Sequence, residues 1–344
     1  MGGPSAEHEV SLATGKNVID NLDKTKYAPV AVKLSKTRST GSGQAVQWFV
    51  NGRLTDMPKA LKSCDLIFNA LHGTFGEDGR VQALMEYYGA RYTGSGVTAS
   101  ALSMDKLRSR EIFKLAGFSV PKTLKIKRGD NYRARLNLFI TKITILPVVV
   151  KPCCNGSSTG VQIINDKNKL SRAIDEAFKF DCKVLVEEFI KGREVTCGVL
   201  DPALQQADVS DNKNCLLSDG ASNPLTLTIG GVTALPVTEV IPQKKHKFFD
   251  YDAKYKPGHS QEITPAEIDE QTYSKVQAIA VRAHQLLGCR GYSRTDMILK
   301  NDRVYVLETN TLPGLTGNSL LPKAAKAVGL TFPKLLEKII KNSI

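Results

Sequence analysis

The chain has 344 residues and a formal net charge of +13, a length that allows two or three domains with cores of their own. It contains no run of eighteen apolar residues and no signal-peptide pattern at its N-terminus, which argues against a membrane or secreted protein. Its seven cysteines include no CxxC pair, so we expect reduced thiols and a cytoplasmic location rather than a disulfide framework.

The positive charge alone would be compatible with nucleic-acid binding. Basic residues are frequent over 122–142 and at 244–247, but no motif of a nucleic-acid-binding module accompanies them. We therefore interpret the charge as a solvated basic surface that also attracts anionic substrates. We expect neither a nucleic acid nor a membrane as partner.

The first predicted domain spans residues 1–94. Apolar segments at 28–34 and 66–71 have the composition of strands and alternate with helical stretches, which is typical of a small parallel sheet. The turn-rich segment 92–96 would join this domain to the next.

The second predicted domain spans residues 95–190. It begins with a predicted helix over 102–116 and continues with apolar strands at 148–151 and 184–189, with a glycine-rich loop after the first strand. We expect these strands to hold a nucleotide against the third predicted domain, residues 191–344.

The third domain is expected to end in an amphipathic helix over 332–340. Its polar stretch over 203–231 is long for a connection and predicts an inserted surface loop.

Two apolar runs in the third domain predict neighbouring strands joined by a polar turn at 300–303. The first run carries Asp296, and the second carries Glu308 and Asn310. Because Glu308 and Asn310 are two residues apart, their side chains leave the same face of a strand. Two carboxylates and an amide oxygen suit Mg²⁺ bound together with nucleotide phosphates. The alternative is a solvated hairpin with charges at its edge.

The hairpin motif R-x-D followed by L-E-x-N-T-x-P-G-x-T resembles the metal-binding end of the ATP-grasp carboxylate–amine ligases, and of D-alanine–D-alanine ligases in particular. Four further segments are similar to motifs of that family and follow in the same order. They are the N-terminal glycine turn at 2–11, an H-G-x-x-G-E-D-G string at 72–79, a phosphate-binding loop at 151–160 and a mobile loop at 249–255. The similarity extends from residue 2 to about residue 322.

The resemblance implies a three-domain ATP-grasp fold of the α/β class, with α+β character in the ATP-grasp part. The family places a strand before the N-terminal glycine turn, whereas Met1 here stands at that turn. We therefore expect the N-terminal domain to lack its first strand, which would weaken the substrate side of the cleft.

The resemblance also implies a reaction. ATP would phosphorylate the carboxylate of one D-alanine, and the amine of a second D-alanine would attack the acyl phosphate to give the dipeptide for peptidoglycan synthesis. Such phosphoryl transfer depends on positioning and charge neutralisation. The partners implied are ATP and D-alanine, two Mg²⁺ (or Mn²⁺) ions at Asp296, Glu308 and Asn310, and a second copy of the chain in a homodimer.

Several residues would bind ATP. Lys151 ends an apolar strand before the glycine-rich loop, where its ammonium can reach phosphates and the loop offers N–H donors. For Lys106 the alternative is a solvated lysine on a helix. By resemblance, the complete ATP-binding set is Lys106, Lys151, Ser158, Glu187, Glu188, Phe189, Ile190, Glu194 and Lys254, with residues 187–190 at the adenine and Glu194 at the ribose.

Other residues would bind the amino acids. The resemblance assigns Glu7 to the ammonium of the first D-alanine, Arg294 to the transferring phosphate and developing oxyanion, and Gly314 to a supporting N–H donor. His72 would lie near the first substrate, although a lone histidine is commonly structural. The catalytic set implied is Glu7, Ser157, Tyr255, Arg294 and Ser319, and Ser319 and Leu320 would bind the second carboxylate.

The sequence leaves two alternatives open, one for the acceptor substrate and one for the activity. Ligases that make D-alanyl-D-lactate lack the Lys-Tyr pair of the mobile loop or carry Phe for Tyr, so the intact pair Lys254-Tyr255 favours an amine acceptor. A D-lactate or other dipeptide ligase is the first alternative. An N-terminally truncated homologue that binds nucleotide with little activity is the second.

Overall fold

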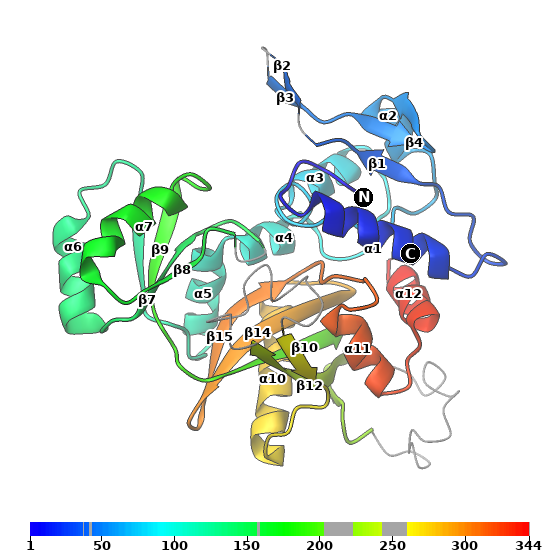
Figure 1. The fold of residues 1–344 in the computed structure, drawn as a ribbon. Helices are drawn as coiled ribbons and strands as arrows, with labels where there is room; N and C mark the ends of the chain where they lie inside the picture. The colour runs from blue at the N-terminus through cyan, green and yellow to red at the C-terminus, as the bar shows by residue number, and fades with distance from the viewer. Residues whose placement is uncertain (37, 41–42, 157–158, 203–222, 243–259, 344) are drawn as a thin grey trace.

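The computed structural model describes residues 1–36, 38–40, 43–156, 159–202, 223–242 and 260–343 (Figure 1). The N-terminal part combines short strands with helices. Its elements are α1 (His8–Asn21), β1 (Val32–Leu34), β2 (Arg38–Thr40), β3 (Gly43–Ala45), β4 (Trp48–Val50), β5 (Arg53–Thr55), α2 (Met57–Leu61) and α3 (Arg80–Tyr87).

The described strands of this part form antiparallel sheets, so the prediction of a parallel sheet is wrong for them. β4 pairs with β1 on one side and with β5 on the other. The turn at Asn51 and Gly52, both with positive φ, closes a hairpin between β4 and β5, a connection that only antiparallel strands permit. Among the described residues of this part, parallel pairing is limited to single contacts, Gly2 with Leu34 and Ile67 with Tyr92.

The central part contains a four-stranded antiparallel sheet in the order β6-β9-β7-β8. Apolar side chains of β7 and β9, including Val148, Val150 and Val184, pack with Ile174 into a core that is closed to solvent. The elements are α4 (Val97–Met104), α5 (Lys106–Leu115), β6 (Thr123–Lys127), α6 (Arg133–Leu138), the π-helical turn η1 (Phe139–Ile143), β7 (Val148–Pro152), β8 (Gln162–Ile164), the 3₁₀ turn η2 (Lys167–Lys169), α7 (Leu170–Ala177) and β9 (Lys183–Glu188).

The helix predicted over 102–116 is interrupted at Asp105. Asp105 has an extended backbone, and its side chain accepts hydrogen bonds from the amides of Leu107 and Arg108. An aspartate in this position caps the next helix, so α5 begins at Lys106. The cap fixes the direction in which Lys106 leaves the helix.

The C-terminal part contains a six-stranded antiparallel sheet, with the path β11-β12-β10-β14-β15 and β13 paired with β12. Val195 and Cys197 of β10 pack in the core cluster of α10, whereas Leu200 packs in the cluster of α11 and α12. The elements are β10 (Arg193–Leu200), β11 (Leu227–Ile229), β12 (Val232–Pro242), β13 (Ser260–Ile263), α10 (Glu270–Leu286), β14 (Tyr292–Lys300), β15 (Arg303–Asn310), α11 (Leu320–Ala327) and α12 (Phe332–Lys341).

Three contacts hold the parts of the chain against one another. Helix α5 packs against β15, and Ser119 pairs with Tyr305 at the edge of the C-terminal sheet, while α12 lies against α1 (Figure 1). The central sheet therefore faces the β14–β15 hairpin across α5.

None of the helices in the described part of the chain combines the length and apolarity of a membrane span. The predicted domain boundaries stay a prediction.

Candidate active site

The predicted hairpin is present as β14 and β15. Asp296 lies directly opposite Glu308 in the antiparallel register, and Arg294 lies opposite Asn310. Glu308 and Asn310 are half-buried while Thr309 between them is buried, as the two-residue period of a strand requires. The turn at 300–303 and the shared face of Glu308 and Asn310 are thus confirmed.

Both carboxylates of the hairpin face cations. Arg294 forms a two-pronged ion pair with Asp296, with Nε–Oδ1 and Nη2–Oδ2 distances of 2.8 and 2.9 Å, and Thr196 donates its hydroxyl to Asp296 Oδ1 at 2.6 Å. Glu308 Oε2 lies 3.1 Å from Nζ of Lys106. The acids are therefore fixed in position by charge as well as by the strands that carry them.

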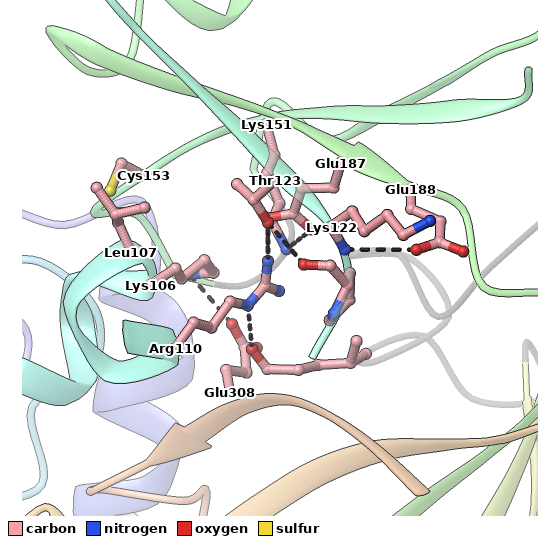
Figure 2. Close-up of polar contacts among 12 residues, drawn as sticks. Lys106, Leu107, Arg110, Lys122, Thr123, Lys151, Cys153, Glu187, Glu188 and Glu308 are labelled. Atoms are coloured by element: carbon pink, nitrogen blue, oxygen red, sulfur yellow. Dashed lines mark hydrogen bonds and ion pairs between the residues drawn. The ribbon is translucent and has the colours of Figure 1, made fainter. Parts of the chain in front are cut away.

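A second group of charged side chains, centred on Glu187, lies near the Lys106–Glu308 pair. Nζ of Lys151 at the end of β7 is 2.9 Å from Oε2 of Glu187 on β9, and Arg110 of α5 pairs with the same carboxylate. The Nε atom of Arg110 also donates to the carbonyl of Leu307, at 3.1 Å. Figure 2 shows Lys106, Arg110 and Lys151 converging from α5 and β7 on the two glutamates.

Burial makes these charges interact strongly. The side chains of Lys106, Arg110, Lys151 and Glu187 are all buried. Burial, followed by the nearby Arg110, lowers the pKa of Lys151 to about 8. Although burial opposes the charged forms, Glu308 holds the pKa of Lys106 above its ordinary value, and Arg110 and Lys151 hold the pKa of Glu187 below its ordinary value.

Two adjoining cavities open beside these charges. One, of about 400 Å³, is lined by Glu7, His72, Glu77, Arg294, Asn310, Gly314 and Ser319 among others. The second, of about 560 Å³, is lined by a larger group that includes Lys151, Glu187, Glu188, Phe189, Ile190, Glu194 and Asp296. Lys106, Glu308 and Leu320 line both cavities. These three residues therefore mark the boundary between two binding spaces.

The far end of the smaller cavity carries a buried polar chain. His72 Nε2 lies 2.9 Å from the Thr14 hydroxyl and His72 Nδ1 lies 3.3 Å from Glu77 Oε1. Glu77 also accepts from the amide of Gly73 at 3.0 Å, and burial raises the pKa of Glu77. This chain fixes the ring of His72 and the turn that follows it.

Two glycines enclose the carboxylate of Glu7. A Cβ atom at Gly73 or Gly156 would lie 2.5 or 2.7 Å from Glu7 Oε2, distances at which the carboxylate has to move. Gly156 belongs to the phosphate-binding loop predicted from sequence, whereas Glu7 precedes α1. Because Gly156 lies close to Glu7, the predicted phosphate-binding loop borders the smaller cavity.

We expect Gly156→Ala to weaken binding of the ligand at Glu7 about tenfold, roughly 1.4 kcal/mol, because the added methyl group displaces the carboxylate. The measurement is the apparent KM of the amino-acid substrate that the sequence resemblance implies for Glu7. Gly317→Ala is the matched control, because a Cβ at Gly317 meets no atom within 4 Å. Equal KM values for the Gly156 variant and the control would contradict the contact.

All predicted site residues in the described part of the chain line one or both of the cavities. Glu7, His72, Arg294, Asn310, Gly314 and Ser319 line the smaller one, and the adenine and ribose candidates line the larger one. Four predicted residues, Ser157, Ser158, Lys254 and Tyr255, lie outside the described residues.

Sequence reasoning missed Arg110, Glu77 and Thr196 as contributors to the site. Arg110 follows Lys106 by four residues, a spacing that places both side chains on one face of a helix, and this was the available signal. Glu77 belongs to the H-G-x-x-G-E-D-G string. Thr196 carries no local signal, because it reaches Asp296 across paired strands.

Two antiparallel sheets around a cavity lined by lysines and carboxylates agree with the ATP-grasp class that the sequence motifs resemble. Family models confirm and narrow this class: one described as "D-ala D-ala ligase N-terminus" matches residues 1–95, and one described as "D-ala D-ala ligase C-terminus" matches residues 112–219 and 221–341. The chain belongs to the D-alanine–D-alanine ligase family.

Individual relatives are similar to this chain over nearly their full lengths. The D-alanine–D-alanine ligase of Syntrophobacter fumaroxidans is 36% identical over 348 residues, which cover 100% of this chain and 96% of that protein. The D-alanine–D-alanine ligase of Bacillus anthracis, solved in complex with ATP, has a TM-score of 0.72 at 30% identity and 100% and 95% coverage. The VanG D-Ala:D-Ser ligase of Enterococcus faecalis has a TM-score of 0.76 at 29% identity, with 100% and 98% coverage.

Proposed function

We propose that this enzyme joins two D-alanine molecules into D-alanyl-D-alanine, with conversion of ATP to ADP and phosphate, and thereby supplies a precursor of peptidoglycan. The observation that carries this proposal is the pair of adjoining cavities, which meet at Lys106, Glu308 and Leu320. A nucleotide in the larger cavity would direct its phosphates toward amino acids in the smaller one. Membership of the ligase family supports the same reaction.

The larger cavity suits ATP. Its apolar and carboxylate-bearing end, residues 187–190 with Glu194, would receive the adenine and ribose, as the sequence resemblance implies. Lys106 and Lys151 also line this cavity, with Lys151 Nζ 2.9 Å from Glu187 Oε2, and they would neutralise phosphate oxygens. Ser158 and Lys254 stay part of the proposed ATP set on the sequence alone.

Asp296, Glu308 and Asn310 fit a Mg²⁺ or Mn²⁺ site, and we propose two ions there. Their donors are hard oxygens, which these cations prefer, and Glu308 lines both cavities. When bound, such ions supply neutralisation of charge on the nucleotide phosphates. Arg294 and Lys106, which contact the same carboxylates, lie within reach of that charge.

The smaller cavity would orient both amino acids. Glu7 would receive the ammonium group of the first D-alanine, whose carboxylate oxygen attacks the γ-phosphorus as ADP leaves. Arg294, with the amide of Gly314, would stabilise negative charge during this step and during attack by the amine of the second D-alanine, which expels phosphate. Ser319 and Leu320 would hold the carboxylate of the second D-alanine, and Ser157 and Tyr255 would assist Glu7.

We expect kcat/KM for ATP to fall above about pH 8, because Lys151, with its pKa lowered to about 8, loses its charge as the pH rises through that value. At lower pH the ammonium is present and attracts phosphate. The measurement is a pH profile at saturating D-alanine, since kcat/KM reports the free enzyme. A Lys151→Arg variant should lack this decline, because guanidinium stays charged. A profile that stays level to pH 10, or a Lys151→Arg profile with the same decline, would contradict the assignment.

The reaction is tested by measuring phosphate release and product mass with D-alanine, L-alanine, or D-alanine mixed with D-serine or D-lactate. The proposed function predicts D-alanyl-D-alanine as the main product of every mixture that contains D-alanine. A mixed product in excess would favour the second candidate, a D-serine or D-lactate ligase. The likeness to the VanG D-Ala:D-Ser ligase supports the D-serine form of this candidate. Phosphate release that requires no amino acid would contradict both.

We further propose that the enzyme is a cytoplasmic homodimer, in keeping with the family resemblance. Analytical ultracentrifugation of the full chain tests the dimer, and a monomer at micromolar concentration would contradict it.

A further inference from the structure

A group of thiols and a carboxylate lies outside both cavities, between β7 and the start of α5. The Asp105 carboxylate and the Cys153 and Cys154 thiols have one ligand atom each within 4.8 Å of one another. The Cys153 thiol donates to Asp105 Oδ1 at 3.2 Å. Figure 2 shows Cys153 beside Leu107 in the first turn of α5. The proposed ligation chemistry uses none of these three side chains.

The backbone holds this group in place. The amide of Cys153 donates to the carbonyl of Lys183 at 3.0 Å, and its own carbonyl accepts from the amide of Lys106 at 3.3 Å. The amide of Cys154 donates to Oδ2 of Asp181 at 2.7 Å. Cys153 is fully buried, while Cys154 and Asp105 are half-buried. Backbone hydrogen bonds therefore hold one side of the group, and the residues on the other side, Cys154 and Asp105, are partly exposed to solvent.

We propose that Asp105, Cys153 and Cys154 bind one thiophilic divalent cation of the Zn²⁺ or Cd²⁺ class. Zn–S and Zn–O bonds of about 2.3 and 2.1 Å place ligand atoms roughly 3.6 to 3.8 Å apart around a tetrahedral ion, so the group, whose ligand atoms lie within 4.8 Å of one another, needs only small side-chain movements. Two sulfur ligands select such a cation over Mg²⁺. Water from the open side completes the coordination.

When the cation is bound, the charge of the site is compensated by a neighbouring lysine. Binding exchanges the two thiol protons, which pass to solvent, for one divalent cation. The cation, two thiolates and the Asp105 carboxylate together carry one negative charge. Lys183 compensates it, because its Nζ lies 2.7 Å from Asp105 Oδ2 and 4.0 Å from the Cys154 sulfur.

A cation bound at this site would alter the proposed ATP cavity through two contacts of Lys106 and its helix. Asp105 caps the helix that begins with Lys106, and Lys106 Nζ donates to the carbonyl of Asn155, the residue after Cys154, at 2.7 Å. A cation that draws Asp105 toward the sulfurs weakens the cap and shifts the loop before Gly156. The bound cation is thus an inhibitor that raises the KM for ATP.

The test is a Cd²⁺ titration of the reduced full chain in excess Mg²⁺, followed by the ultraviolet absorption of cadmium–thiolate bonds. We expect one tight equivalent, with affinity lowered at least about a hundredfold in Cys154→Ser. Cys182→Ser is the matched control, because Cys182 is an exposed thiol of the neighbouring segment, and it should keep the tight equivalent. Cys154 is half-buried, so this variant is expected to fold, and its circular dichroism and melting temperature verify this.

Tight binding that persists in Cys154→Ser, or that is lost equally in Cys182→Ser, would overturn the site. The KM for ATP gives a second readout: Cd²⁺ should raise it in the parent protein and in Cys182→Ser but not in Cys154→Ser. Equal inhibition of all three would place the cation at the hairpin carboxylates and overturn the proposal. Because the absorption titration needs no turnover, it stands even if the ligase reaction itself is disproved.

Discussion

Glu308→Gln is expected to reduce the ligation rate at least about a thousandfold, roughly 4 kcal/mol of barrier. Glu308 lines both cavities and lies 3.1 Å from Lys106 Nζ, so its charge serves the proposed metal site and also orients a buried ammonium. Glutamine keeps the shape of the side chain but removes this charge. The measurement is kcat as a function of Mg²⁺ concentration, which should also show a raised requirement for Mg²⁺.

Asp302→Asn is the matched control for this variant. Asp302 is an exposed acid at the turn of the same hairpin, so its neutralisation leaves both cavities intact and should leave kcat near the parent value. A Glu308→Gln protein that folds and retains more than a tenth of the parent activity would rule out the assigned role.

Arg294→Lys is expected to lower kcat about a hundredfold, the scale on which loss of one charge-stabilising donor acts, with a much smaller effect on the KM for ATP. Arg294 presents a planar fork that pairs with both oxygens of Asp296. Lysine preserves the positive charge but not the fork. Steady-state kinetics with both substrates separates the effect on kcat from the effect on binding.

Arg303→Lys provides the comparison, because Arg303 is an exposed residue at the start of β15. That change should leave kcat within about twofold of the parent value. If Arg294→Lys behaved in the same way, charge alone would be sufficient at this position and the fork would have no role.

Features that depend on local sequence could be predicted. The β14–β15 hairpin, its turn and the shared face of Glu308 and Asn310 follow from a two-residue period and from turn residues. Lys151 was identifiable because a lysine at the end of an apolar strand is unusual. The resemblance to ATP-grasp ligases rested on five such local motifs in order.

Features that depend on distant partners could not be predicted. The N-terminal sheet is antiparallel because β4 returns beside β1, a pairing that the composition of the strands does not specify. The helix predicted over 102–116 is divided because the cap formed by Asp105 outweighs the helical pattern on either side. The pairing of Arg110 with Glu187 joins residues 77 positions apart and needs the fold to bring them together.

Transfer of isotope from substrate to phosphate tests the proposed reaction most directly. D-Alanine labelled with ¹⁸O in both carboxylate oxygens is incubated with the enzyme, Mg²⁺ and ATP, and the released phosphate is analysed by mass spectrometry. Attack of the carboxylate on the γ-phosphorus, at the boundary where Lys106 and Glu308 line both cavities, predicts one ¹⁸O atom in each phosphate formed together with D-alanyl-D-alanine. Unlabelled phosphate, or label recovered in AMP, would contradict it.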